Sequence, residues 1–298
     1  MKQQFLDSVS ICKLYKTVYS GLHLSEILNE DLLKFFKVKY INVYQYFSTI
    51  SCIGSILEYY TDKKIKNNKT IHIFGSGFIA KPNSSSNEKF YRPIQFHILR
   101  GKLSRERCEK ITGKDLSSVT LGDPGLLISK IFSNIKPKKK FDVGIILHFY
   151  DKNENIKKHL NFKNISFKFI DIELDTKKFV EEVASCKFIL SSAMHGLICA
   201  DSLNIPNKHI ILSDKVEGGT YKFLDYYSVF PYFKYNPINL YKTNIILNND
   251  DINNMRKEYN IKKSDVKKIQ KNLQIVILNF NHLKNHIKIK FLHYLTSL

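Results

Sequence analysis

The sequence has few cysteines, and they are not paired in the way that zinc sites require. The five cysteines are odd in number and widely spaced, at Cys12, Cys52, Cys108, Cys186 and Cys199. Because no C-x-x-C cluster occurs, we expect reduced, structural thiols and no metal site. The sequence also has no Gly-x-y period, heptad run or fixed-length repeat, which excludes fibrous and solenoid proteins.

Long apolar runs are missing as well. The first residues, MKQQFLDSVSICKLYK, contain no uninterrupted apolar stretch as long as that of a signal peptide. No segment reaches the roughly 18 consecutive apolar residues of a membrane-spanning helix. We therefore expect a cytoplasmic protein.

Acidic residues and arginine are both scarce. The chain has 47 Lys and Arg against 27 Asp and Glu, a net charge of +20, and only five of the basic residues are arginine. This charge favours an anionic partner such as an acidic membrane surface, a phosphorylated substrate or nucleic acid. Proteins that read nucleic acids favour arginine for its planar fork, so we do not expect nucleic acid to be the partner.

Two glycine signatures of nucleotide-binding enzymes are absent. No G-x-x-x-x-G-K-[ST] occurs, and Ala80 stands where the dinucleotide fingerprint would need its third glycine. P-loop NTPases and dinucleotide-dependent redox enzymes are therefore disfavoured, and we expect no cofactor.

What the sequence does contain is typical of an α/β protein. With 298 residues and 43 % hydrophobic content, the chain can bury a sizeable core. Six short β-rich runs alternate with helix-length segments and predict strands over residues 70–74, 95–99, 141–149, 166–172, 187–191 and 208–213. Such runs are typical of parallel sheets covered by helices on both faces.

A lysine-rich stretch interrupted by proline, SNIKPKKKF, is the best linker in the chain. We place an N-terminal α/β domain at residues 1–137 and a Rossmann-like domain at residues 138–263. The apolar spacing in residues 264–298 predicts one basic amphipathic helix. Two roles are open for this helix: packing on the core across both domains, or lying on an anionic bilayer.

Polar or glycine-containing turns follow several of the predicted strands, where open α/β sheets bind ligands. Gly75, Ser76 and Gly77 follow the first run, and their backbone amides could approach a phosphate or carboxylate, although an ordinary tight turn has the same pattern. Arg100 ends the next run and could bind an oxyanion or form a surface ion pair. Asp123, in the string LGDPGLL, lies at a turn before an apolar helix and is either functional or a helix cap.

The strongest motif is FILSSAMHGLICADSLNIP. It predicts a strand that ends at Ser191 and Ser192, followed by His195 and Gly196 at the start of a helix. The positive end of the helix dipole favours a neutral imidazole, which can accept or relay a proton. This arrangement points to acid–base catalysis or ligand binding rather than to an ordinary buried histidine.

Two further groups of residues are candidates for substrate contacts. Lys222, Asp225 and Tyr226 lie within one predicted helical turn after a glycine pair, and could form either an ion pair or a substrate rim. His148 and Asp151 end the run FDVGIILHFYD and could reach a cleft between the domains.

In their order along the chain, these motifs resemble the polysaccharide pyruvyl transferase family. The matching strings lie between about residues 45 and 230 and are ISCIGSIL, IHIFGSGF, ILRGKLSRE, LGDPGLL, DVGIILHFYD, SSAMHGLICADSLNIP and GTYKFLDYY. The resemblance implies two Rossmann-like domains arranged as in GT-B glycosyltransferases. It also implies an enzyme that moves a pyruvyl group from phosphoenolpyruvate onto a sugar of a bacterial surface polysaccharide, as a ketal, without a metal or cofactor.

The resemblance also assigns roles by position. It implies donor binding by Arg100 and the loop of Ser76, and an acid–base or phosphate-contacting role for His195. Together with the motifs above, we expect catalytic roles for His195, Asp123 and Lys222, donor binding by Gly75, Ser76, Gly77, Arg100, Ser192 and Gly196, and acceptor binding by His148, Asp151, Asp225 and Tyr226. Ala193 stands where some branches carry a donor-binding arginine. A GT-B-type glycosyltransferase that uses a nucleotide-activated sugar is therefore the alternative. The acceptor would be a glycan, free or lipid-linked, and the last helix offers a peripheral contact with the inner face of the membrane.

Overall fold

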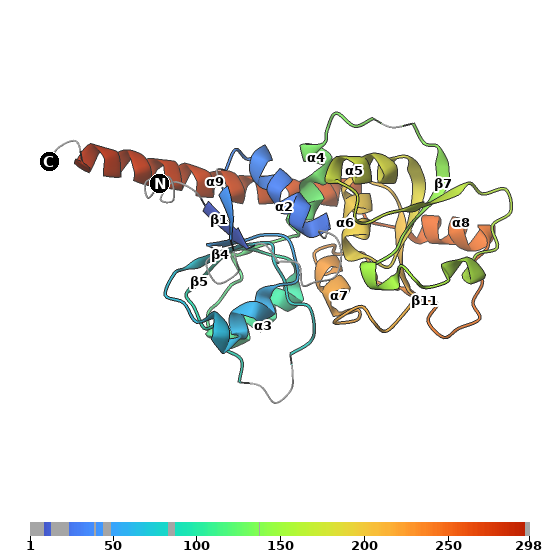
Figure 1. Ribbon diagram of the computed structural model, residues 1–298, viewed down its shortest axis with the longest axis horizontal. Helices are drawn as coiled ribbons and strands as arrows, with labels where there is room; N and C mark the ends of the chain where they lie inside the picture. Colours follow the sequence, from blue (N-terminus) through green and yellow to red (C-terminus); the bar gives the residue numbers. More distant parts are fainter. Residues whose placement is uncertain are drawn as a thin grey trace.

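The chain folds into two parallel sheets with helices packed against them (Figure 1). The structure is a computed structural model and describes residues 9–12, 24–38, 40–43, 49–82, 87–136 and 138–295. The first sheet has the order β2-β1-β3-β4-β5-β6 and the second the order β11-β10-β9-β7-β8. The prediction of an α/β chain with parallel sheets is confirmed.

The strands of the two sheets come from separate parts of the chain. The first sheet contains β1 (Val9–Cys12), β2 (Tyr40–Val43), β3 (Ile50–Ser51), β4 (Ile71–Phe74), β5 (Ile94–Leu99) and β6 (Thr120–Leu121). The second contains β7 (Phe141–Ile146), β8 (Phe167–Ile170), β9 (Cys186–Ser191), β10 (Asn207–Ile211) and β11 (Ile238–Asn239). The arrangement of two Rossmann domains as in GT-B enzymes stays a prediction, because parallel sheets alone do not define it.

Two of the helices begin at side chains that cap them. Within the described residues they are α2 (Leu24–Phe35), α3 (Lys102–Thr112), α4 (Ile128–Ile131), α5 (Thr176–Ala184), α6 (Met194–Ser202), α7 (Tyr221–Tyr227), α8 (Asn249–Glu258) and α9 (Lys263–Leu295). The side chain of Asp175 accepts a hydrogen bond from the amide of Lys178 at the start of α5. A capping box formed by Asn248 and Asp251 begins α8.

The first part of α9 packs on the core. Val266, Ile269 and Leu273 are buried, and the side-chain amide nitrogen of Gln270 donates a 2.7 Å hydrogen bond to the carbonyl oxygen of Leu126. Gly122 has a φ of +148°, and a Cβ there would lie 2.7 Å from Ile269. Up to residue 280, the apolar face of the helix is therefore used by the protein interior. The apolar positions predicted beyond it, Leu283, Ile287 and Phe291, lie outside the described side chains.

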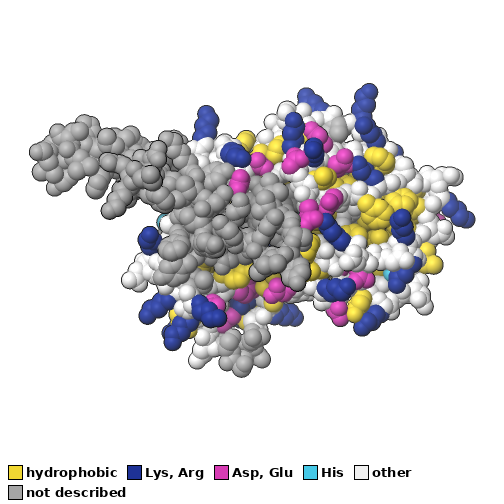
Figure 2. All heavy atoms as spheres, in the orientation of Figure 1, with side chains coloured by type: hydrophobic (Ala, Val, Ile, Leu, Met, Phe, Trp, Pro, Cys, Tyr) yellow, Lys and Arg dark blue, Asp and Glu magenta, His cyan; other side chains and the backbone are white. Residues whose placement is uncertain are grey.

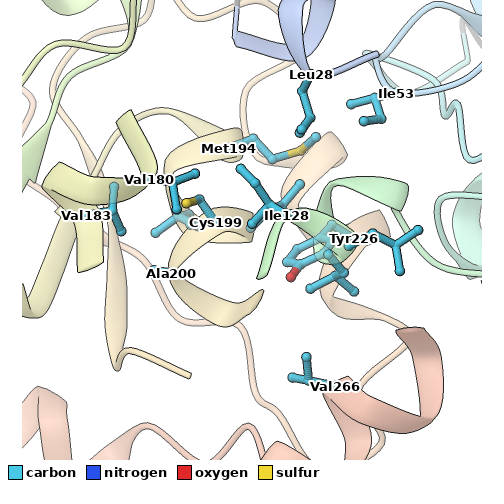
Figure 3. Close-up of a cluster of buried hydrophobic side chains, with 14 of the residues drawn as sticks. Leu28, Ile53, Ile128, Val180, Val183, Met194, Cys199, Ala200, Tyr226 and Val266 are labelled. Atoms are coloured by element: carbon cyan, nitrogen blue, oxygen red, sulfur yellow. The ribbon is translucent and has the colours of Figure 1, made fainter. Parts of the chain in front are cut away.

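One buried cluster joins helices from both halves of the chain (Figure 3). Leu28 of α2 and Ile53 lie near Ile128 and Met194, with Tyr226 of α7 on the same cluster. Because these residues come from sequence positions on both sides of the linker, the two sheets share a continuous apolar contact. Such a contact restrains the two halves relative to each other.

No helix of the described part of the chain is both long and apolar enough to cross a membrane. The positive charge is not gathered in one place on the face seen in Figure 2, where Lys and Arg side chains are scattered with Asp and Glu between them.

Candidate functional site

Three strand ends of the second sheet meet at its carboxyl edge. The hydroxyl oxygen of Ser192, just after β9, accepts a 2.8 Å hydrogen bond from the amide of His148, just after β7. The amide of Ser192 in turn donates to the carbonyl oxygen of Ile146. Beyond β10, the hydroxyl of Ser213 donates a 2.5 Å hydrogen bond to a carboxylate oxygen of the buried Asp151. The structure thus brings Ser192 to the segment of His148 and Asp151, which the sequence had marked as a separate group.

A cavity of about 340 Å³ opens at this edge. We call it the carboxyl-edge cavity, and its polar lining includes Asp151, Ser192, His209, Ser213, Asp214, Glu217, Thr220 and Tyr241. The segment from Ser213 to Thr220, which connects β10 to α7, forms much of its wall. A Cβ at Gly218, whose φ is +75°, would lie 2.0 Å from the carbonyl oxygen of Ile79. This glycine therefore allows the segment to pack directly on the first half of the chain.

Lys222, the second residue of α7, is 7 % exposed and lies close to this cavity. Burial and the nearby positive charge of Arg100 lower the pKa of Lys222, Glu217 and Asp151 act in the opposite direction, and the net result is a pKa of about 8. Glu217 and Asp151 both line the cavity. Lys222 is therefore a cation within electrostatic reach of a ligand bound there, and a proton donor near neutral pH.

His209 was not singled out in the sequence, because it lies inside the apolar run KHIILS. Its ring stacks on Phe223 with the ring centres 3.8 Å apart, and its Nδ1 lies 2.6 Å from the hydroxyl of Tyr235. Burial lowers the pKa of His209 to about 3. At neutral pH this side chain is an uncharged wall of the carboxyl-edge cavity, not a cation. Ser213 and Glu217 were also missed, because serine and glutamate in a loop carry no signal of their own.

His195 is the second residue of α6, three positions after Ser192. The helix can start this close to the strand ends because residue 196 is glycine: a Cβ there would lie 2.6 Å from the hydroxyl oxygen of Ser191. Gly196 is thus needed for packing. The roles of His195 in catalysis and of Ser192 in donor binding stay predictions, and both residues lie at the edge where the cavity opens.

Arg100 and Asp225 form a buried ion pair and do not line a ligand site as expected. Both side chains are fully buried, and the guanidinium Nε of Arg100 lies 2.9 Å from a carboxylate oxygen of Asp225. The other carboxylate oxygen accepts a 2.8 Å hydrogen bond from the amide of Ser104, and the guanidinium also donates to the hydroxyl of Ser55 and the carbonyl of Phe78. Direct contact of Arg100 with a donor, or of Asp225 with an acceptor, conflicts with this burial. The pair instead fixes α7 to the first sheet.

The glycines of the Gly75–Gly77 loop make room for protein atoms. Gly75 has a φ of +101°, and a Cβ there would lie 2.1 Å from Cδ of Pro124, while a Cβ at Gly77 would lie 2.4 Å from Cζ of Arg100. The hydroxyl of the fully buried Ser76 lies 2.7 Å from that of Ser51. The expectation that this loop holds the donor is therefore corrected: the alternative of a structural turn describes it.

Tyr226 and Asp123 are also fully buried. The hydroxyl of Tyr226 donates a 2.8 Å hydrogen bond to Asp201, which places it in the core and not among acceptor contacts. Asp123 caps the short 3₁₀ helix Pro124–Leu127 by accepting a 2.8 Å hydrogen bond from the amide of Gly125. Burial raises the pKa of Asp123 to about 6. The helix-cap alternative thus describes Asp123, and its burial argues against direct contact with substrate.

Among the described residues, no group of three or more His, Cys, Asp or Glu side chains is placed to hold a metal ion. The polar cavity at the carboxyl ends of parallel strands is the ligand site expected of an α/β enzyme.

The chain belongs to the polysaccharide pyruvyl transferase family, whose profile matches residues 10–210. The description of that family names transfer of a pyruvyl group and a polysaccharide. The matched region contains His148, Asp151, Ser192 and His195, whereas Lys222 lies beyond it.

Three individual proteins are also similar to this chain. An uncharacterised protein of Acanthamoeba polyphaga mimivirus is 34 % identical over 192 residues, covering 61 % of this chain and 63 % of that protein, so the chain spans less than two thirds of that relative. A functionally uncharacterised protein of Klebsiella pneumoniae subsp. pneumoniae NTUH-K2044 is 12 % identical, covering 80 % of this chain and 95 % of the other, with a TM-score of 0.43. The wall teichoic acid polymerase TagF is 11 % identical, covering 91 % of this chain and 82 % of the other, with a TM-score of 0.37.

Proposed function

We propose that this enzyme moves a pyruvyl group from phosphoenolpyruvate onto two hydroxyls of a sugar in a bacterial surface polysaccharide, forming a ketal, and that the reaction takes place at the carboxyl-edge cavity. One observation carries the assignment of the site. In a member of this family, Asp151 and Ser192 line a single cavity, Ser192 accepts a hydrogen bond from the amide of His148, and the lysine with the lowered pKa lies beside them.

The proposed reaction sets three demands. A proton must be added to the methylene carbon of the enol phosphate, two sugar hydroxyls must lose their protons as they bond to the central carbon, and inorganic phosphate must leave from that carbon. Two carbon–oxygen bonds to the sugar replace the carbon–oxygen bond to phosphate and the π bond of the enol. One of the two hydroxyl protons is balanced by the proton added to the methylene carbon and the other by the departing phosphate, so no oxidant or reductant is needed. The site must therefore supply proton donors, proton acceptors and positive charge.

The residues in and beside the cavity have the chemistry for these demands. Below a pH of about 8 Lys222 is an ammonium that would stabilise the carboxylate or the departing phosphate. We assign proton transfer to the donor to His195, and contact with the acceptor hydroxyls to His148. Asp151 is fully buried and acts by holding the hydroxyl of Ser213 at the cavity wall. Arg100 and Asp225 act indirectly, because they hold the helix that carries Lys222.

The proposal extends to the location of the acceptor. A net charge of +20 favours the approach of an anionic donor and of an acceptor linked to lipid diphosphate at the inner face of a membrane. Because the apolar face of α9 is buried as far as Ile277, contact with the membrane over that part of the helix would depend on lysine side chains and on the exposed Ile275 and Leu278.

The experiment is a thermal-shift titration with phosphoenolpyruvate and, in parallel, a panel of nucleotides and nucleotide sugars. A ligand present at a hundred times its dissociation constant stabilises the folded protein by about 2.7 kcal/mol. We expect stabilisation by phosphoenolpyruvate, its loss in Lys222→Met, and its retention in Lys215→Met, which removes an exposed lysine near the same loop. Stabilisation by nucleotide sugars alone would assign the enzyme to the glycosyltransferase alternative.

A further inference from the structure

A second cavity, of about 300 Å³, lies on the same half of the molecule. It is formed by the amino end of β10, the segment 232–236 and the end of α8, and we call it the aromatic cavity. Its aromatic lining consists of Tyr227, Tyr232, Phe233, Tyr235 and Tyr259, together with the ring of His209. The roles assigned above to the catalytic site use none of these tyrosines.

The aromatic walls are held in fixed positions. The hydroxyl of Tyr259 donates a 2.8 Å hydrogen bond to Asp201, and the hydroxyl of Tyr227 donates a 3.2 Å bond to Asn207. The rings of Tyr227 and Phe233 stack with centres 4.4 Å apart. Because bonds to buried groups fix both ends of these side chains, the cavity is formed before any ligand arrives, which reduces the entropic cost of binding.

The polar groups at the rim favour an uncharged ligand. The ammonium of Lys208 lies 3.5 Å from a carboxylate oxygen of Glu258, and Lys234 also lines the cavity. The lining thus has charges of both signs, and a phosphate bound there would face the carboxylate of Glu258 as well as the two lysines. Asn236 and Asn260 add amide donors and acceptors to the lining. Burial raises the pKa values of Tyr227 and Tyr259, so their phenols are neutral. A ligand whose hydroxyl groups both donate and accept hydrogen bonds matches this rim.

We infer that the aromatic cavity binds a neutral sugar ring of the acceptor glycan, at a distance from the sugar that receives the pyruvyl group. The flat carbon–hydrogen face of such a ring fits an aromatic wall, and its hydroxyls fit the amides and the ion pair at the rim. Tyr232, which is 68 % exposed, is the ring most open to a ligand.

The position of the two cavities suits a polymeric acceptor. His209 lines both, Asn207 lines the aromatic cavity, and Ile211 lines the carboxyl-edge cavity. The four steps of strand between Asn207 and Ile211 span roughly 13 Å. A single sugar does not reach across this distance, whereas a chain of several sugars does. The naming of the bound glycan as the acceptor rests on the proposed function; the sugar site itself does not.

The test is direct binding without donor, by saturation-transfer NMR with malto-, cello-, galacto- and chito-oligosaccharides of one to four units. We expect signals from at least one series that strengthen with chain length. Tyr232→Ala should weaken that binding about three- to tenfold, because it removes one aromatic contact. Tyr59→Ala, which removes an exposed tyrosine from the other half of the molecule, should leave it unchanged.

Three results would overturn the inference: no binding by any of these sugars, equal weakening in both variants, or tighter binding of nucleoside monophosphates that Tyr232→Ala abolishes. The phosphoenolpyruvate titration is independent of all three. Sugar binding without a phosphoenolpyruvate shift would refute the proposed donor and keep the sugar site, and the reverse result would keep the donor and refute the sugar site.

Discussion

At the scale of single residues, Lys222 connects stability with function. Its pKa falls from 10.5 to about 8 on folding, so the folded protein binds its proton less tightly than the unfolded chain does. The stability lost by burying the charged lysine is therefore largest below a pH of about 8, and this loss disappears as the pH rises from 8 to 10.5. A shift of this size corresponds to roughly 3 kcal/mol as an upper value.

We expect Lys222→Met to raise the free energy of unfolding at pH 7 by about 1–3 kcal/mol, because methionine fills a similar volume without a buried charge. It should also flatten the dependence of stability on pH between 8 and 10.5. Urea unfolding at several pH values measures both effects. Lys215→Met is the matched control and should change neither, because that lysine is exposed. A destabilised Lys222→Met protein would contradict the assignment of a buried charge.

His195 gives a second prediction at this scale. If it transfers a proton in the reaction, His195→Ala should lower turnover by a factor of roughly a hundred to ten thousand. The side chain is only partly buried, so the melting temperature should change little. Phosphate release from phosphoenolpyruvate, measured beside the melting temperature, tests this. Turnover near that of the wild type would remove His195 from the mechanism.

At the scale of structural elements, the junction between α3 and α7 depends on Gly101. Its φ of −160° is open to any residue, but a Cβ there would lie 1.8 Å from the carbonyl oxygen of Asp225. Gly101→Ala must therefore push α7 away from the first sheet, disturbing the Arg100–Asp225 pair and the helix that carries Lys222. We expect a loss of about 3 kcal/mol or more, together with loss of donor binding.

Gly113, at the other end of α3, provides the matched control. Its φ is +67° and nothing lies within 4 Å of a Cβ built on it. Gly113→Ala should cost only about 1 kcal/mol, from backbone strain, and should leave donor binding intact. Denaturant unfolding and the thermal shift with phosphoenolpyruvate compare the two variants. Equal effects would show that contact between α7 and Gly101 has no special importance.

The same elements show what could be predicted from the sequence. Strands β4, β5, β7, β8, β9 and β10 were all expected, because each is a β-rich, largely apolar run of at least four residues. The strands β3, β6 and β11 were not, because they are only two residues long. Runs this short carry little periodicity, and their pairing with neighbouring strands stabilises them. The strands β1 and β2 were not expected either, although they have four residues, as β4 and β8 do.

The site was predictable only in part, for a related reason. His148, Asp151 and Ser192 follow strands, so their meeting at one sheet edge follows from topology. Arg100 also follows a strand, but its partner Asp225 lies 125 positions away and closes the site to ligands. Local sequence does not encode such a distant contact. A buried ion pair and a substrate-binding arginine therefore have the same local signature.

At the scale of the whole molecule, α9 holds the two halves together. Val266, Ile269, Leu273 and Ile277 are buried in the cluster that both halves share. Full burial of four such side chains contributes roughly 6–12 kcal/mol. The total stability of a typical domain is about 5–15 kcal/mol, so the contribution of this helix is of the same size as the whole.

A chain that ends at residue 262 should therefore lose cooperative thermal unfolding in both halves, rather than become a folded enzyme that merely fails to bind membranes. Circular dichroism on heating, with an intact chain as reference, measures this. Ile275→Asp is the matched control, because Ile275 lies on the same helix but is 45 % exposed, and it should unfold as the wild type does. A soluble, cooperatively folded and catalytically active shortened chain would instead show that the helix docks elsewhere. The core would then be complete without α9, and binding of vesicles by the full chain could be attributed to that helix.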